Sequence, residues 1–218
     1  MTPPQPPEHP PSPVDILRDK RAMLDTGTGP IAFVVVYAIW GLQTAAIVAI
    51  ALGVVMAIER VARKKTVVNV LGGLFVTVIS AVIAWRTGKA ETYFVPRALI
   101  QAWYAIVFAG SAVIRRPLTG FLVAALFRAE PSWVRLPAVR RAMTELTLAW
   151  AALFAFRAVV YGVLIATGRV GWLAAASVAM GWPAFGLWMF LSYRFVPMRL
   201  AQLGAPDPRH PEPPDPAP

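Results

Sequence analysis

The sequence predicts an all-α fold: a polytopic membrane helical bundle of about five transmembrane helices, preceded by a short N-terminal re-entrant or interfacial arm. The composition is 57% hydrophobic and 15% charged, whereas a soluble domain carries about 25% charged residues. Long charge-free runs match the length of about 20 residues that a helix needs to cross a bilayer. The period-two alternation of a membrane β-barrel does not appear, which leaves helices to satisfy the backbone in lipid.

The apolar runs place the helices. Charge-free stretches cover residues 26–58, 66–85, 98–114 and 170–193, and a further run, 143–167, is interrupted by Glu145 and Arg157. The shorter run 117–127 follows two arginines and cannot span a membrane. We therefore predict an interfacial helix for residues 117–127, on the cytoplasmic leaflet.

The first run is too long for one upright helix. Residues 31–58 would reach about 42 Å at 1.5 Å per residue, and the Trp40-Gly41 pair offers a break. Pro30 suits the first position of a helix, so we predict an arm over 30–40 and a fuller helix over 43–58. One steeply tilted helix is the alternative.

Two proline-rich tails frame this body. Seven of the 21 prolines lie within residues 1–13 and seven within 205–218, and proline opposes both helix and sheet. We predict a disordered N-terminal segment over 1–29, a transmembrane domain over 30–197 and a disordered tail over 198–218. The N-terminal segment is acidic and has no apolar run before residue 31, so a signal peptide is not predicted.

The net charge of +10 becomes a topology signal. With five spans, thirteen basic residues fall in 59–66, 115–141 and 194–209, on one side, and four fall on the other. By the positive-inside rule, the side with thirteen basic residues is cytoplasmic. We therefore predict a multi-pass protein of the inner (cytoplasmic) membrane whose C-terminus is cytoplasmic. The N-terminus is cytoplasmic if 30–58 is a hairpin and outside if it is one tilted helix. The basic excess thus indicates the lipid bilayer as partner and argues against nucleic acid.

The residues that most often bind metals or act as catalytic nucleophiles and bases are missing from the apolar body of the chain. The chain has no cysteine, and its two histidines, His9 and His210, lie in the tails. We therefore predict no metal site and no cofactor, and no catalytic residue can be assigned.

Arg157 is the leading functional candidate because it sits in the middle of an apolar run, where a charge costs at least ~2.5 kcal/mol. Tyr161 shares its helix face at a spacing of four. One interpretation is a buried ion pair, with Glu91 or Glu59 as partner, that fixes the helix register. The other is an arginine that binds an anion or orients a substrate.

A polar stripe follows one face of the run 98–114. Arg97, Gln101 and Tyr104 are spaced four and three residues apart, and this face could line a hydrated cavity. Glu91 precedes the stripe in the loop 86–97. The candidate ligand-binding residues are therefore Arg157, Tyr104, Gln101, Arg97, Glu91 and Tyr161.

Four stretches resemble an uncharacterised family of small integral membrane proteins from high-GC Gram-positive bacteria. They are Gly72-Gly73-Leu74, Arg86-Thr-Gly-Lys-Ala-Glu-Thr-Tyr-Phe-Val-Pro96, Ile114-Arg-Arg-Pro-Leu-Thr-Gly120, and Leu148-Ala-Trp-Ala-Ala-Leu-Phe154 with Arg157. Their order and spacing are similar, more distantly, to the bacterial septation protein A family. That resemblance implies an inner-membrane protein of envelope maintenance and division, and it carries over no site residue.

Three functions follow as hypotheses. The first is a non-enzymatic envelope or division protein with a lipidic ligand or another hydrophobic small molecule. The second is a membrane-embedded cyclase or isomerase acting on a hydrophobic polyketide or isoprenoid, which predicts a closed, partly polar cavity. The third is a small transporter, for which inverted repeats and paired broken helices are expected. Oligomeric state is not predicted.

Overall fold

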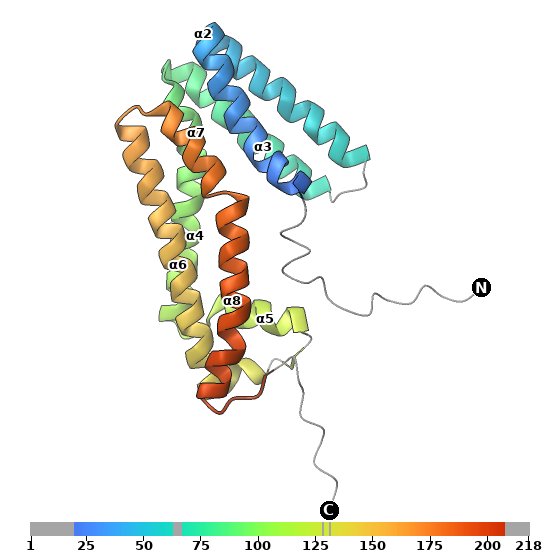
Figure 1. Ribbon diagram of the computed structural model, residues 1–218, viewed down its shortest axis with the longest axis vertical. Coiled ribbons are helices and arrows are strands. Elements are labelled where there is room, and N and C mark those ends of the chain that lie inside the picture. Colours follow the sequence, from blue (N-terminus) through green and yellow to red (C-terminus); the bar gives the residue numbers. More distant parts are fainter. Residues whose placement is uncertain (1–19, 63–66, 128, 131, 208–218) are drawn as a thin grey trace, which may run out of the picture. The chain divides into compact units, whose positions relative to one another are not determined.

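The computed structural model describes residues 20–62, 67–127, 129–130 and 132–207, and every regular element in these ranges is helical (Figure 1). This confirms the predicted all-α fold. The elements are α2 (Lys20–Ala62), α3 (Val67–Thr87), η1 (Ala90–Phe94), α4 (Val95–Val113), α5 (Leu118–Phe127), η2 (Trp133–Arg135), α6 (Pro137–Ala166), α7 (Val170–Ala179) and α8 (Trp182–Gln202).

The helical part is longer at both ends than the predicted domain 30–197. Helix α2 begins at Lys20, and Pro30 lies inside it rather than in its first turn. Lys20 to Leu24 are good helix formers, but the following Asp25-Thr-Gly-Thr-Gly29 are not, so local propensity does not explain this extension. Helix α8 continues to Gln202. The remaining parts of the predicted tails, 1–19 and 208–218, lie outside the described residues.

The helices have the length and composition of membrane spans. In the described chain, three segments qualify as single spans: Gly29–Glu59, Pro137–Ala166 and Val170–Gln202. The pair Ala90–Val113 and Leu118–Phe127, bent by 89°, can add a fourth, and Gly72–Thr87 is a shorter apolar helix. Each of the five predicted runs therefore coincides with apolar helix, as expected for a multi-pass membrane protein.

The described chain divides into two compact units, and the first is built on a helical hairpin. It comprises the described residues of Met1–Pro96 and Val163–Phe190. Gly41 interrupts α2 with φ 80° and ψ −178°, and the two halves of α2 run back from a shared apex (Figure 1). The break predicted at Trp40-Gly41 is thus confirmed. Of the two alternatives for residues 30–58, the structure has the hairpin and not the single tilted helix.

Close contacts hold the hairpin against its neighbours. A Cβ atom on Gly53 would lie 3.2 Å from Thr77 Cγ2 and 3.3 Å from Leu74 Cδ1, so glycine lets α2 approach α3 closely. The Phe33 ring stacks on Tyr93 with centroids 4.0 Å apart and an interplanar angle of 10°. Phe94 meets Phe33 edge-on at 6.4 Å. This aromatic cluster fixes the first half of α2 on η1.

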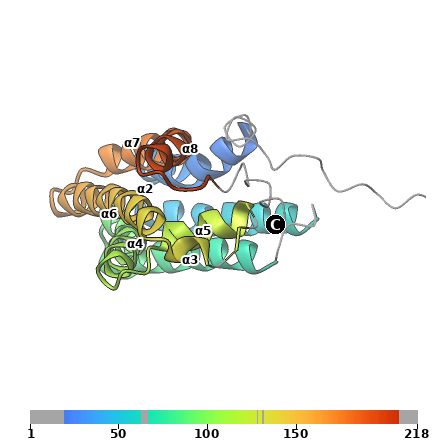
Figure 2. The same cartoon turned by 90° about the horizontal axis from the view of Figure 1, so that it is seen from below.

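The second unit comprises the described residues of Arg97–Gly162 and Leu191–Pro218. Helices α4 and α6 lie side by side in it, as both views show (Figures 1 and 2). Phe154 of α6 packs on Tyr104 and Phe108 of α4, each with a centroid distance of 5.3 Å. Trp150 donates from Nε1 to Ser192 Oγ at 3.2 Å, which ties the middle of α8 to α6.

Candidate functional site

Arg157 lies within the apolar helix α6 and is 4% exposed. Tyr161, one turn further along the helix, is 2% exposed and interacts electrostatically with Arg157. Phe154, one turn before Arg157, packs against α4. Because residues three and four apart share a helix face, the same face of α6 carries an aromatic contact, a buried cation and a buried phenol.

The polar stripe of α4 faces this part of α6. Tyr104 packs on Phe154, and Arg97 lies within electrostatic range of Arg157. Gln101 is placed between them on the stripe, and its Oε1 atom is buried with no hydrogen-bond partner in the described part of the chain. The structure thus brings together five of the six predicted candidates within the second unit.

The sixth candidate, Glu91, belongs to the first unit. It lies on the short helix η1 and is half-buried. Glu59, the other acidic partner considered for Arg157, is in the same unit, at the end of α2. The ion pair expected between Arg157 and one of these carboxylates therefore stays a prediction.

The arrangement suits an anion with a polar headgroup. The guanidinium groups of Arg97 and Arg157 would both attract a negative charge brought to this part of α4 and α6. Arginine binds phosphate and carboxylate through two parallel N–H groups. The buried Gln101 carbonyl oxygen would accept a hydrogen bond from a hydroxyl group of the same headgroup.

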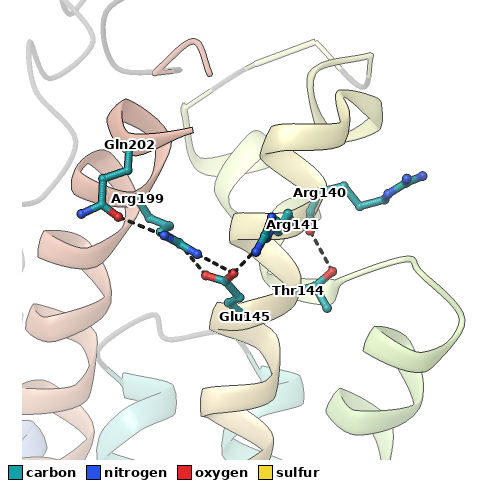
Figure 3. A network of polar contacts seen from close by, with 6 residues as sticks. All are labelled: Arg140, Arg141, Thr144, Glu145, Arg199 and Gln202. Carbon is teal, nitrogen blue, oxygen red and sulfur yellow. Dashed lines mark hydrogen bonds and ion pairs between the residues drawn. The ribbon is translucent and has the colours of Figure 1, made fainter. Parts of the chain in front are cut away.

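A second polar cluster lies at the other end of α6. Arg199 of α8 donates to both carboxylate oxygens of Glu145, and Arg141 reaches the same carboxylate at 3.5 Å (Figure 3). Sequence reasoning missed this cluster. The spacing of Arg141 and Glu145 was a visible signal for the local pair, but nothing in the sequence pointed to Arg199.

Metal chemistry finds no support in the part of the chain that the structure describes. No group of three or more histidine, cysteine, aspartate or glutamate side chains there could hold a metal ion.

The long apolar helices are those of a multi-pass helical membrane protein. The chain belongs to the DUF3159 family, which is described as a protein of unknown function; the match covers residues 20–202. These bounds coincide with the first residue of α2 and the last residue of α8. No curated protein and no solved structure matches the chain. The family match includes all six candidate residues.

Proposed function

We propose that the chain is a non-enzymatic protein of the cytoplasmic membrane that binds a lipidic anion at one face of the second unit. We call this face the two-arginine face; it consists of Arg97, Gln101, Tyr104, Arg157 and Tyr161. The observation that carries the proposal is the burial of Arg157 in the apolar helix α6, together with the buried Gln101 Oε1 on the stripe of α4, which has no hydrogen-bond partner among the described residues.

Energetics favour a bound anion at this face. A cation at the centre of an apolar helix costs several kcal/mol in lipid unless it is balanced. A negative charge beside Arg157 and Arg97 would interact favourably with both guanidinium groups. A lipid delivers its headgroup and its apolar chains together, and the aromatic rings of Tyr104 and Phe154 would accept the chains.

Contacts inside each unit support the proposed orientation. The Arg199–Glu145 pair sets the end of α8 beside the start of α6, so the basic segment 115–141 and the basic end of α8 share one side of the membrane. In the first unit, the hairpin returns the chain after Gly41 towards the end where α2 began (Figure 1). The positive-inside rule then favours a cytoplasmic location for the basic loops and for the C-terminus.

A role in envelope maintenance or division is supported by the distant resemblance to the septation protein A family. The stretches 72–74, 114–120 and 148–154, which carry that resemblance, all lie on or beside described helices. In the proposed orientation Arg97 lies on the non-cytoplasmic side, so the anionic lipid at the two-arginine face would belong to that leaflet.

The test is binding of two lipids with equal chains to delipidated protein in mild detergent. We expect dioctanoyl phosphatidylglycerol to bind at least about tenfold more tightly than dioctanoyl phosphatidylcholine, with a matching rise in melting temperature. Arg157→Gln and Arg97→Gln should each clearly lower this preference. The control is Arg169→Gln, since Arg169 is exposed and lies outside the two-arginine face. Equal binding of both lipids, or an unchanged preference in Arg157→Gln, would refute the proposal.

A further inference from the structure

The turn between α4 and α5 has a precise hydrogen-bond pattern. Arg116 N donates to Ser111 O at 2.9 Å, and Arg115 N donates to Ala112 O at 3.0 Å. These two bonds form a Schellman motif, in which the residue in the left-handed conformation is usually glycine. Here that residue is Arg115, with φ 57°. The backbone therefore accepts an unfavourable conformation while it presents an arginine at the corner.

Buried contacts pin the helix that follows. Thr119 Oγ1 lies 2.7 Å from Thr147 Oγ1 and donates to Met143 O at 2.9 Å. A Cβ atom on Gly120 would lie 2.9 Å from Val134 Cγ1, so glycine allows the closest approach. Helix α5 is thus held firmly on α6 and η2, at 89° to the preceding helical segment.

The first amides of α5 already have acceptors. Leu118 N lies 3.4 Å from Ser111 Oγ, and Gly120 N donates to Pro117 O at 3.0 Å. The N-terminus of α5 is therefore not the source of anion affinity at this corner. The positive charge that the corner offers comes from the exposed side chains of Arg115 and Arg116.

The outer face of α5 is apolar. Leu122 and Leu126 are each 61% exposed, and Phe121 lies beside them with about half of its surface exposed. The opposite face carries the buried residues Thr119, Gly120 and Ala124. A rigid helix with one outward apolar face, two arginines at its start and a right-angle bend has the form of an interfacial membrane helix.

We infer that the corner of α4 and α5 binds an anionic phospholipid of the surrounding leaflet, separately from the two-arginine face. The lipid phosphate contacts Arg115 and Arg116, and its acyl chains cover Phe121, Leu122 and Leu126. Helix α5 then lies in the plane of the membrane. Charge complementarity selects this occupant, because the arginines meet the negative surface potential of the cytoplasmic leaflet.

The orientation of α5 can be tested with spin labels, because the chain has no cysteine of its own. Leu122→Cys and Leu126→Cys are labelled with a nitroxide in phosphatidylglycerol-containing nanodiscs, and the depth is read from oxygen and nickel accessibility. We expect equal, shallow depths at the two positions. A spanning or re-entrant α5 would separate them by about 6 Å and would overturn the inference. Spin–spin broadening at Leu122 would instead show a second copy on this face and would also overturn it.

The lipid preference is tested with the double variant Arg115→Gly/Arg116→Gln. Glycine suits the left-handed position, so this variant should fold at least as well as the wild type. The local concentration of a fluorescent phosphatidylglycerol is read from the quenching of its fluorescence by the nitroxide at position 122. We expect its enrichment there to fall by about 10- to 30-fold in the double variant. The matched control, Arg86→Gln/Arg169→Gln, removes two exposed arginines elsewhere and should leave the enrichment unchanged. An undiminished enrichment in the double variant, or an equal loss in the control, would contradict the inference.

Discussion

Arg199 and Glu145, 54 residues apart, form a bidentate ion pair: Nε lies 2.7 Å from one carboxylate oxygen and Nη2 lies 2.8 Å from the other (Figure 3). The remaining guanidinium nitrogen, Nη1, donates to Gln202 Oε1 at 3.0 Å. This geometry matches the planar fork of arginine to a carboxylate. The pair joins the last turns of α8 to the first turns of α6.

Removing this pair should loosen the end of α8. We expect Arg199→Gln to lower the melting temperature by about 2–4 °C, because it breaks both bonds to Glu145. Arg199→Lys should recover part of this loss, since lysine keeps the charge but not the fork. The matched control is Arg141→Gln, whose contact with Glu145 is longer and more exposed; its effect should be smaller. Equal effects of the two glutamine variants would show that the bidentate geometry contributes nothing.

The hydroxyl pair under α5 should be worth more than an ordinary surface contact. Thr147 is fully buried, and its hydroxyl contacts Thr119 Oγ1 and donates to Met143 O. We expect Thr147→Val to lower the free energy of unfolding by about 0.5–2 kcal/mol, the range of interhelical hydrogen bonds in membrane proteins. Thr144→Val, which removes a bond within α6 alone, is the control. The free energy of unfolding of both variants is measured with denaturant in detergent. Equal values for Thr147→Val and Thr144→Val would contradict a stabilising role for the Thr119–Thr147 pair.

Gly41 should resist substitution for backbone reasons. Its φ of 80° with ψ of −178° falls in a region that is essentially restricted to glycine, and no atom lies within 4 Å of an added Cβ. We expect Gly41→Ala to cost about 1–3 kcal/mol. Gly72→Ala, also with open space around it but in a regular helix, should be neutral or stabilising. Similar thermal stability of the two variants would contradict the sharp break in α2.

The sequence pattern predicted those features of the fold that depend on local composition, namely the positions of the helices and the break in the first one. The charge-free runs located the helices, and Trp40-Gly41 marked the hairpin break because glycine tolerates conformations closed to other residues. The start of α2 at Lys20 could not be predicted, because Asp25-Thr-Gly-Thr-Gly29 and Pro30 disfavour a helix at this place. Arg157 was recognisable because a charge in an apolar run is costly.

Long-range partners could not be read from the sequence. The Arg199–Glu145 pair joins helices that are far apart in the chain, and helical periodicity gives the face of each residue without naming the opposite helix. The same holds for the contact of Thr119 with Thr147. The stripe through Arg97, Gln101 and Tyr104 predicted a polar face of α4, but only the structure shows that Phe154 of α6 packs on Tyr104.

The most direct test of the two-arginine face is the free energy of unfolding of Arg157→Leu, measured with and without phosphatidylglycerol. A ligand that binds the folded protein stabilises it in proportion to its binding. We expect phosphatidylglycerol to stabilise Arg157→Leu clearly less than the wild type, and Arg169→Gln as much as the wild type. Equal stabilisation of the wild type and Arg157→Leu would contradict the proposed function.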